Sequence, residues 1–224
     1  ELTAIPGLSG HEELVARYVT AELQNLGLTV RSDALGNIWT ELPPAGSAAE
    51  QPVLVFAHMD ELGLLVRQVT ENGFIRVERL GGVPERVLPG TRVTIHATQG
   101  ELTGVVGLKS HHVTPADEKY VALPVGSLYV DAGVRSRAEA DELGILTGTA
   151  ITYAAHFTRL RGTLRSAKSM DNRAGLTILL LLARRLRAAA LSTPVVLAGT
   201  VQEEFNLAGV VGLAHRLAPR AALC

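Results

Sequence analysis

The chain has 224 residues, of which 47% are hydrophobic, and a formal net charge of −1 at pH 7. This composition predicts a globular protein with a sizeable core, organised as one large domain or two modest ones. The nearly neutral, interspersed charge argues against nucleic acid or an anionic membrane as a partner. No apolar run is long enough to span a membrane and no leader pattern opens the chain, so we expect a cytoplasmic protein.

The single cysteine, Cys224, excludes an internal disulfide framework and a zinc site built from thiolates. Any metal chemistry must therefore use His, Asp and Glu. The chain begins at Glu1 without Met and stops in a segment that resembles the start of a buried strand. We therefore expect the sequence to be part of a longer protein, truncated at its carboxyl end.

The first predicted elements are a helix and three strands. Ser9 and Glu12 have the spacing of a capping box, and apolar residues then recur at helical intervals until Gly27. The run at 53–57 is apolar throughout, which is typical of a central strand in an α/β sheet, and His58 follows it. Between the helix and this strand we predict a strand at 28–32, a strand at 37–41 and a loop at 43–52.

From residue 64 to residue 164 the pattern changes to short β runs separated by turn signals. One short helix interrupts them at 136–143, where Ser136 and Glu139 form a second capping-box pattern. The predicted β runs lie at 64–70, 74–80, 92–97, 104–108, 127–130 and 150–158.

After this module the helix and strand rhythm resumes. We predict an α/β fold, with a mixed sheet flanked by helices, built from residues 1–63 and 165–224. Residues 64–164 would form a β-rich domain inserted into it. The late elements are a helix near 172–190, a strand at 195–201, a helix near 207–217 and an incipient strand at 221.

Acidic and imidazole side chains stand at the ends of three predicted elements. His58 and Asp60 follow one apolar strand, Glu203 and Glu204 follow another, and Asp171 opens a long helix. Because ligands bind at the carboxyl ends of strands in open α/β sheets, we expect these side chains to meet in one site. Imidazole and carboxylates without thiolates suit a catalytic zinc, cobalt or manganese ion.

Each of these residues also has an ordinary structural explanation, such as a helix N-cap at Asp171 or a solvated Glu pair. Their joint position at element ends favours function. Asp60 is placed to orient the His58 imidazole. Glu203 and Glu204 cannot point the same way along an extended chain, so one can bind a metal while its neighbour activates a water.

The chain resembles the glutamyl or deblocking aminopeptidases, the tetrahedral (TET) family of dinuclear metallopeptidases, which is peptidase family forty-two. The resemblance covers essentially the whole chain. Its motifs are Leu8 to Glu13, Ala57 to Gly63, Gly107 to Lys109, Tyr129 to Gly133, Glu142 to Ile145, Lys168 to Arg173 and Val201 to Glu204.

The resemblance implies a phosphorylase/hydrolase-like zinc peptidase domain that holds two divalent ions, zinc or cobalt, in each subunit. His58 would bind one ion, Asp171 would bridge both and Glu204 would bind the second. Glu203 would be the general base, with Asp60 supporting His58. The family's remaining ligands, an Asp and a His, would lie beyond residue 224, so the chain taken alone is expected to hold two ions poorly.

The implied activity is the removal of N-terminal residues from short peptides. The inserted β-rich domain would mediate dimers that assemble into a homo-oligomer, a dodecamer in the family. Two alternatives stay open, namely a related deacylase or carboxypeptidase and a non-catalytic assembly or peptide-binding protein. Metal content separates the enzyme from the binding protein, since two ions per chain favour the first and none favours the second.

Overall fold

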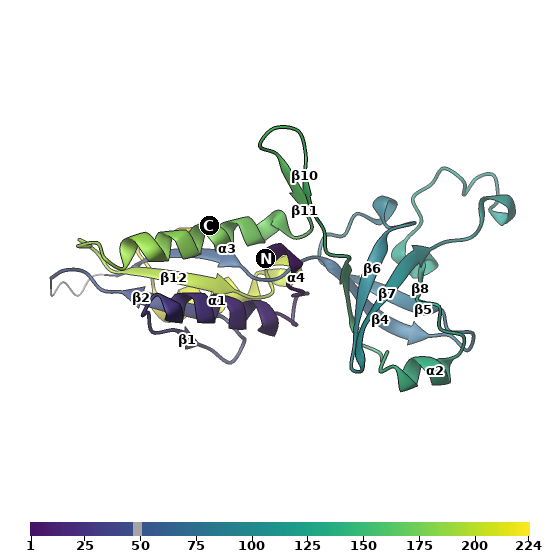
Figure 1. The fold of residues 1–224 in the computed structure, drawn as a ribbon, viewed down its shortest axis with the longest axis horizontal. Coiled ribbons are helices and arrows are strands. Elements are labelled where there is room, and N and C mark those ends of the chain that lie inside the picture. The colour runs from purple at the N-terminus through teal and green to yellow at the C-terminus, as the bar shows by residue number, and fades with distance from the viewer. Residues whose placement is uncertain (47–50) are drawn as a thin grey trace. The chain divides into compact units, whose positions relative to one another are not determined.

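The computed structural model describes residues 1–46 and 51–224, so the predicted loop at 43–52 lies partly outside the described residues. These residues form two compact units. An α/β unit comprises Glu1–Glu61 with His156–Cys224, and a β-rich unit comprises Leu62–Ala155. The colours of Figure 1 follow the chain out of the first unit, through the second and back. The predicted fold class is confirmed.

The division lies close to the predicted boundaries of the inserted domain but does not coincide with them. Residues 156–164 belong to the α/β unit. There β10 (Phe157–Arg159) pairs antiparallel with β11 (Arg165–Ala167) in a separate two-stranded hairpin, visible in Figure 1. The single strand predicted at 150–158 is therefore two strands, because the chain leaves β9 (Ala150–Tyr153) before it enters β10.

The α/β unit is built on a five-stranded mixed sheet with the order β1-β2-β12-β3-β13. The strands β3 and β12 run parallel in the middle, and β2 is antiparallel to β12. β13 pairs with the other edge of β3 in parallel. The bounds are β1 Arg31–Ser32, β2 Ile38–Leu42, β3 Val53–His58, β12 Val195–Thr200 and β13 Ala221–Leu223.

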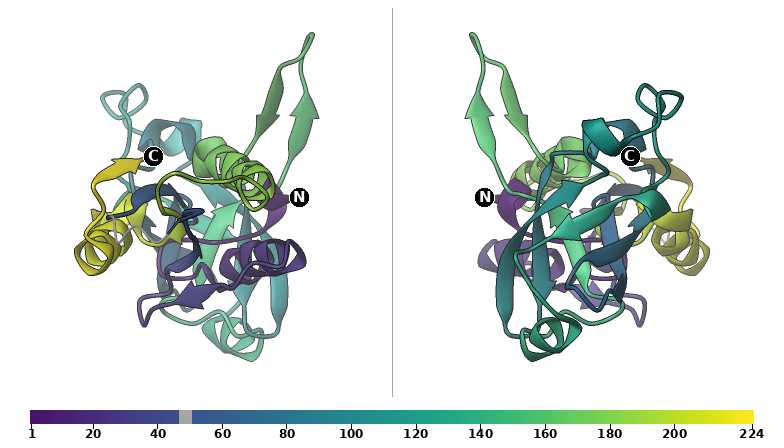
Figure 2. Two further views of the ribbon diagram at one scale, coloured as in Figure 1. Left: turned by 90° about the vertical axis from the view of Figure 1, so that its left-hand side faces the viewer. Right: turned by 90° about the vertical axis from the view of Figure 1, so that its right-hand side faces the viewer.

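Helices cover both faces of this sheet (Figure 2). One face packs against α1 (Glu13–Asn25) and α3 (Met170–Leu186) through a shared apolar cluster. The other face packs against α5 (Ala208–Leu217), where Leu213 lies in the cluster around Trp39. The alternation of side chains along β2, β3 and β12 divides their apolar residues between the two clusters.

The predicted helix is present as α1, but it starts at Glu13, three residues later than the Ser9–Glu12 capping box implied, and the predicted capping box is wrong. The N-cap residue is Glu12, and no side chain caps the helix. Glu12 accepts hydrogen bonds from the N–H of Gly10 and of Gln202, while the Ser9 hydroxyl donates to Asp60. Both residues are drawn away from the helix end by groups far along the chain.

The β-rich unit is a closed barrel with the strand order β4-β5-β8-β7-β6-β9. Closure leaves no free sheet edge, and one apolar cluster fills the interior. The helix α2 (Arg137–Glu142) carries the predicted cap, because the Glu139 N–H donates to Ser136 Oγ at 3.1 Å. The other strands are β4 Gly63–Val69, β5 Ile75–Leu80, β6 Arg92–Ala97, β7 Gly100–Gly107 and β8 Tyr129–Asp131.

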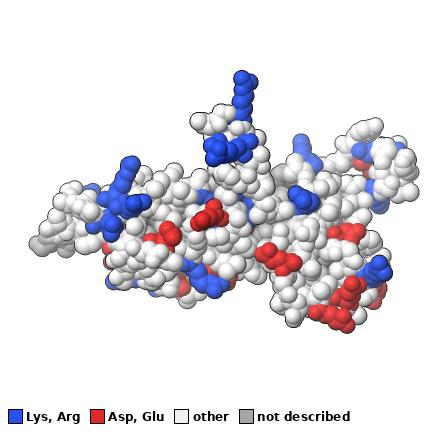
Figure 3. Space-filling model, viewed as in Figure 1, with Lys and Arg blue, Asp and Glu red and all other residues white. Residues whose placement is uncertain are grey.

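Short 3₁₀ turns complete the described structure, and none of its helices has the length and apolar character to cross a membrane. Figure 3 shows positive and negative side chains interspersed over the visible face, with basic side chains on the β10–β11 hairpin. The 3₁₀ turns are Leu2–Ala4, Glu85–Val87, His111–Val113 and Val125–Ser127.

Candidate metal centre

The candidate site lies at the carboxyl ends of the two central parallel strands. In their register His58, the last residue of β3, stands opposite Thr200, the last residue of β12. The chain beyond β12 enters α4 (Glu203–Asn206) at once. This topology places His58 beside the two glutamates, as expected from their positions at strand ends.

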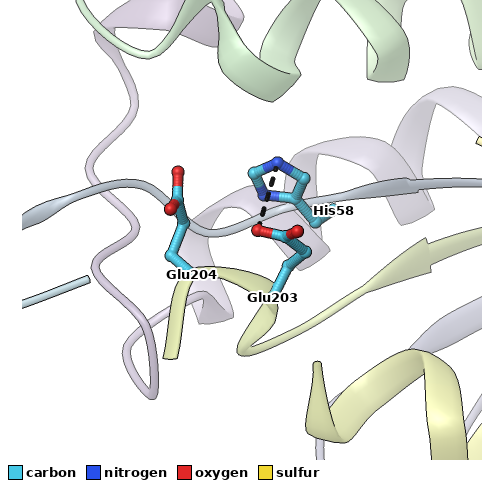
Figure 4. Close-up of side chains that lie close together, drawn as sticks. All are labelled: His58, Glu203 and Glu204. Carbon is cyan, nitrogen blue, oxygen red and sulfur yellow. Dashed lines mark ion pairs between the residues drawn. The ribbon is translucent and has the colours of Figure 1, made fainter. Parts of the chain in front are cut away.

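Three side chains form a compact donor cluster in this place (Figure 4). His58, Glu203 and Glu204 each offer one ligand atom, and these atoms lie within 4.8 Å of one another. His58 Nε2 lies 3.9 Å from Glu203 Oε2, the ion pair drawn in Figure 4. The imidazole is buried and the glutamates are half-buried, so the cluster opens toward the glutamate side.

Asp171 reaches the same imidazole from the start of α3. Its Oδ1 lies 2.9 Å from His58 Nε2, and its side chain is 85% exposed. The backbone at Asp171 and Asn172 departs from helical geometry, and the Asn172 side chain accepts the N–H of Gly175. Asp171 is therefore not a simple helix N-cap, and its carboxylate is free to face the cluster.

Asp60 lies behind the cluster and is fully buried. Its Oδ1 is 3.3 Å from His58 Nδ1, which makes no well-aligned hydrogen bond. The same carboxylate accepts the N–H groups of Glu203 and Glu204 at 3.0 Å each and the Ser9 hydroxyl at 2.5 Å. Asp60 thus organises the imidazole on one strand end and both glutamates on the other.

Glu203 and Glu204 do not alternate along an extended chain, so this prediction is wrong. They form the first turn of α4, because Asp60 accepts both of their N–H groups and Gln202 adopts a left-handed conformation with φ 55°. Successive helical residues also diverge in direction. Both side chains nevertheless reach the His58 cluster.

The electrostatics of the cluster follow from burial among carboxylates. Burial lowers the pKa of His58, but Asp60 and Asp171, with the charge of Glu203, raise it to about 9. Burial acts to raise the pKa of Asp60, but His58, Ser9 and the two glutamate N–H groups hold it below its usual range. Burial raises the pKa of Glu204, as do the neighbouring carboxylates. The site therefore favours bound positive charge.

This donor set fits a divalent metal ion. An imidazole and several carboxylates converge without a thiolate, and the acidic residues outnumber the fixed cations that contact the cluster. His58 Nδ1 faces Asp60, which would leave Nε2 as the ligand atom and fix the ring orientation. The described residues that could hold an ion here are His58, Glu203 and Glu204, and Asp171 adjoins them through its contact with His58.

Several residues that shape the site were not identified from the sequence as site residues. Glu12 and Asn37 accept backbone N–H groups of the segment before Glu203. Glu61 forms a buried ion pair with Lys168, whose Nζ lies 2.7 Å from both carboxylate oxygens. The sequence signal that could have identified Glu61 is its position among the charged residues that follow the apolar run at 53–57.

Known proteins share this fold and much of this sequence. The family described as M42 glutamyl aminopeptidase matches residues 36–224. The lysyl aminopeptidase of Pyrococcus furiosus is 34% identical over 206 residues, which are 91% of this chain and 58% of that protein. The glutamyl aminopeptidase of Lactococcus lactis subsp. cremoris is 31% identical over 212 residues, 93% of this chain and 59% of that protein.

The solved structure of the Pyrococcus horikoshii TET1 peptidase is 33% identical, with a TM-score of 0.89. The match covers 99% of this chain and 65% of that one. The chain thus spans less than two thirds of the length of these relatives. The family match includes every residue of the donor cluster, and the chain belongs to the M42 glutamyl aminopeptidase family.

Proposed function

We propose that the protein is a metal-dependent aminopeptidase that removes N-terminal residues from short peptides. The observation that carries this proposal is the convergence of His58, Glu203 and Glu204 within 4.8 Å in a chain of this family. Relatives named lysyl and glutamyl aminopeptidases support the reaction class.

His58 and Glu204 would each bind one of two divalent ions, zinc or cobalt, and Asp171 would bridge them. When bound, such ions polarise a peptide carbonyl and lower the pKa of an attacking water. Two contacts support this proposal: Asp171 Oδ1 lies 2.9 Å from His58 Nε2, and the ligand atoms of Glu204 and His58 lie within 4.8 Å of each other.

Glu203 would act as the general base. Its carboxylate is 35% exposed and lies beside the imidazole, where it can accept a proton from the attacking water. The same carboxyl group can return that proton to the leaving amine when the peptide bond breaks. Asp60 does not take part in the proton transfer, because its oxygens hold the N–H groups of both glutamates and the Ser9 hydroxyl.

The activity is tested with the native protein and a panel of aminoacyl chromogenic substrates, after chelation and after addition of zinc or cobalt. We expect hydrolysis that disappears on chelation and returns with metal, together with two bound ions per chain. Peptides blocked at the N-terminus separate an aminopeptidase from a deacylase or carboxypeptidase. Absence of hydrolysis and of bound metal would favour a non-catalytic binding protein instead.

We also propose that the barrel, predicted as the dimerisation domain, carries an interface between copies of the chain. Val113 and Val121 are 71% and 62% exposed on it, and the related TET1 peptidase can assemble into a tetrahedron or an octahedral shell. Changing both valines to Lys should lower the mass measured by light scattering. Leu14→Lys, at an exposed site of the α/β unit, is the matched control.

The cytoplasmic location stays a prediction from the sequence.

A further inference from the structure

The segment that links β12 to α4 is held by side chains at four consecutive backbone positions. Each N–H group in this segment donates to an oxygen that comes from a distant part of the chain. The bonds run from Val201 to Asn37 Oδ1 (3.1 Å), from Gln202 to Glu12 Oε1 (3.0 Å), from Glu203 to Asp60 Oδ1 (3.0 Å) and from Glu204 to Asp60 Oδ2 (3.0 Å).

The bond to Gln202 holds the residue whose backbone turns the chain toward the site. Gln202 has φ 55° and ψ 36°, a left-handed conformation that residues other than glycine rarely adopt. Such a conformation persists only where the surroundings determine it. The carboxylate that accepts its N–H belongs to Glu12, which is 5% exposed, so water competes little for this bond.

The Glu12 carboxylate is itself fixed in place. The same oxygen, Oε1, accepts the N–H of Gly10 at 2.9 Å. Three residues before Glu12, Ser9 donates its hydroxyl to Asp60, the acceptor for the next two N–H groups of the segment. The short stretch of chain before α1 thus holds in place the carboxylates of Glu12 and Asp60, which accept the N–H groups at the start of α4.

We propose that Glu12 is a positioning residue for Glu203, an inference that rests on the proposed function. Glu12 is not part of the donor cluster at His58 and acts through the backbone of Gln202. By holding that residue in its left-handed conformation, Glu12 sets the direction in which the Glu203 and Glu204 side chains leave the chain. The required property is the acceptor oxygen and not the negative charge.

Two substitutions separate the acceptor from the charge. Glu12→Gln keeps an oxygen at the same reach, whereas Glu12→Ala removes it. In the native protein we expect Glu12→Ala to lower kcat by about 10- to 100-fold with little change in KM, because small displacements of catalytic groups have effects of this size. Glu12→Gln should restore most of kcat. Glu13→Ala, at the exposed neighbouring position, is the control and should match the native protein.

A second measurement does not depend on activity. Amide hydrogen exchange at residues 201–204 should be faster in Glu12→Ala than in the native protein, and close to native in Glu12→Gln. This exchange pattern tests the positioning role even if the native protein hydrolyses no substrate, an outcome that would count against the proposed function alone. Equal losses in both variants, or native exchange and kcat in Glu12→Ala, would overturn the inference.

Discussion

The α/β unit and the barrel differ in what they bury. Both have apolar cores, but among the residues that the structure describes almost every buried polar or charged side chain lies in the α/β unit. The barrel contributes Thr152, whose Oγ1 lies 2.9 Å from His96 Nε2. The α/β unit contributes Ser9, Glu12, Asn37, Thr40, His58, Asp60, Glu61, Lys168, Arg173 and Thr200.

This difference separates two tasks. A closed barrel with an apolar interior gains its stability from burial and has little need of charge. Buried charges are expensive unless they are paired, and in the α/β unit Glu12 and Asp60 accept hydrogen bonds from the segment that carries Glu203 and Glu204. Changes in the two units should therefore have effects of different kinds as well as different sizes.

The largest expected effect concerns Glu203, the proposed general base. Glu203→Gln should lower kcat by roughly 100- to 10,000-fold in the native protein, the usual contribution of general base catalysis, while both metals stay bound. Glu204→Gln removes the anionic ligand that we propose for the second ion and should lose about one equivalent of metal on dialysis, with partial recovery in excess metal. Metal analysis together with kinetics tests which glutamate is the base and which is the ligand. If Glu203→Gln is the variant that loses the ion, the two roles are reversed.

The next effect is on stability and comes from the buried charges. Glu61 pairs with Lys168, accepts the N–H of Gly7 at 3.0 Å and lies 4.0 Å from Arg173 Nη2. Glu61→Ala leaves two buried cations without this carboxylate and should lower the free energy of unfolding by about 3–5 kcal/mol. Urea denaturation measures it, and Glu78→Ala, exposed on the barrel, is the control. If Glu61→Ala lowers the free energy of unfolding no more than Glu78→Ala does, Glu61 does not stabilise the two buried cations.

A smaller effect is expected in the barrel core. Ile95 is fully buried and packs in the barrel cluster. Ile95→Val removes one methylene group and should lower the free energy of unfolding by about 0.5–1.5 kcal/mol. Because this residue supports no polar group of the site, kcat and metal content should stay at native values. A change in metal content would contradict the division of tasks between the units.

The smallest effect is a pH dependence at Glu12. Burial raises the pKa of this carboxyl group in the folded state above its usual value, even though three backbone N–H groups act in the opposite direction. Ionisation therefore destabilises the fold, and this penalty grows as pH rises through the folded pKa. Gln does not ionise, so the stability of Glu12→Gln relative to native protein should increase from pH 4 toward pH 7. Glu13→Gln, which is exposed, should show no such trend.

Local patterns sufficed to predict most elements of the fold. The apolar run at 53–57 and the periodicity that starts after Glu12 depend on neighbouring residues, and both elements are present as β3 and α1. The approach of His58 to Glu203 was also predictable, because parallel strands bring their carboxyl ends to the same edge.

The backbone of the site was not predictable in this way. The turn at Gln202 and the start of α4 depend on hydrogen bonds to Glu12 and Asp60, which lie well over a hundred residues earlier in the chain. The same remote bonds explain why Ser9 and Glu12 do not form a capping box. A short motif shows which acceptors are available, but it does not show which donors the rest of the fold will bring to them.

The strand order of the central sheet has a consequence for the order of events during synthesis. β3 pairs with β12 and β13, yet the whole barrel sequence, residues 62–155, is translated between β3 and these partners. The barrel draws its contacts from one uninterrupted stretch and can fold as soon as that stretch leaves the ribosome. At about 5–20 residues per second, the apolar strand Val53–His58 would wait at least several seconds with both edges unpaired. During this interval, before the central sheet can close around β3, the nascent chain should be most sensitive to aggregation and most dependent on chaperones.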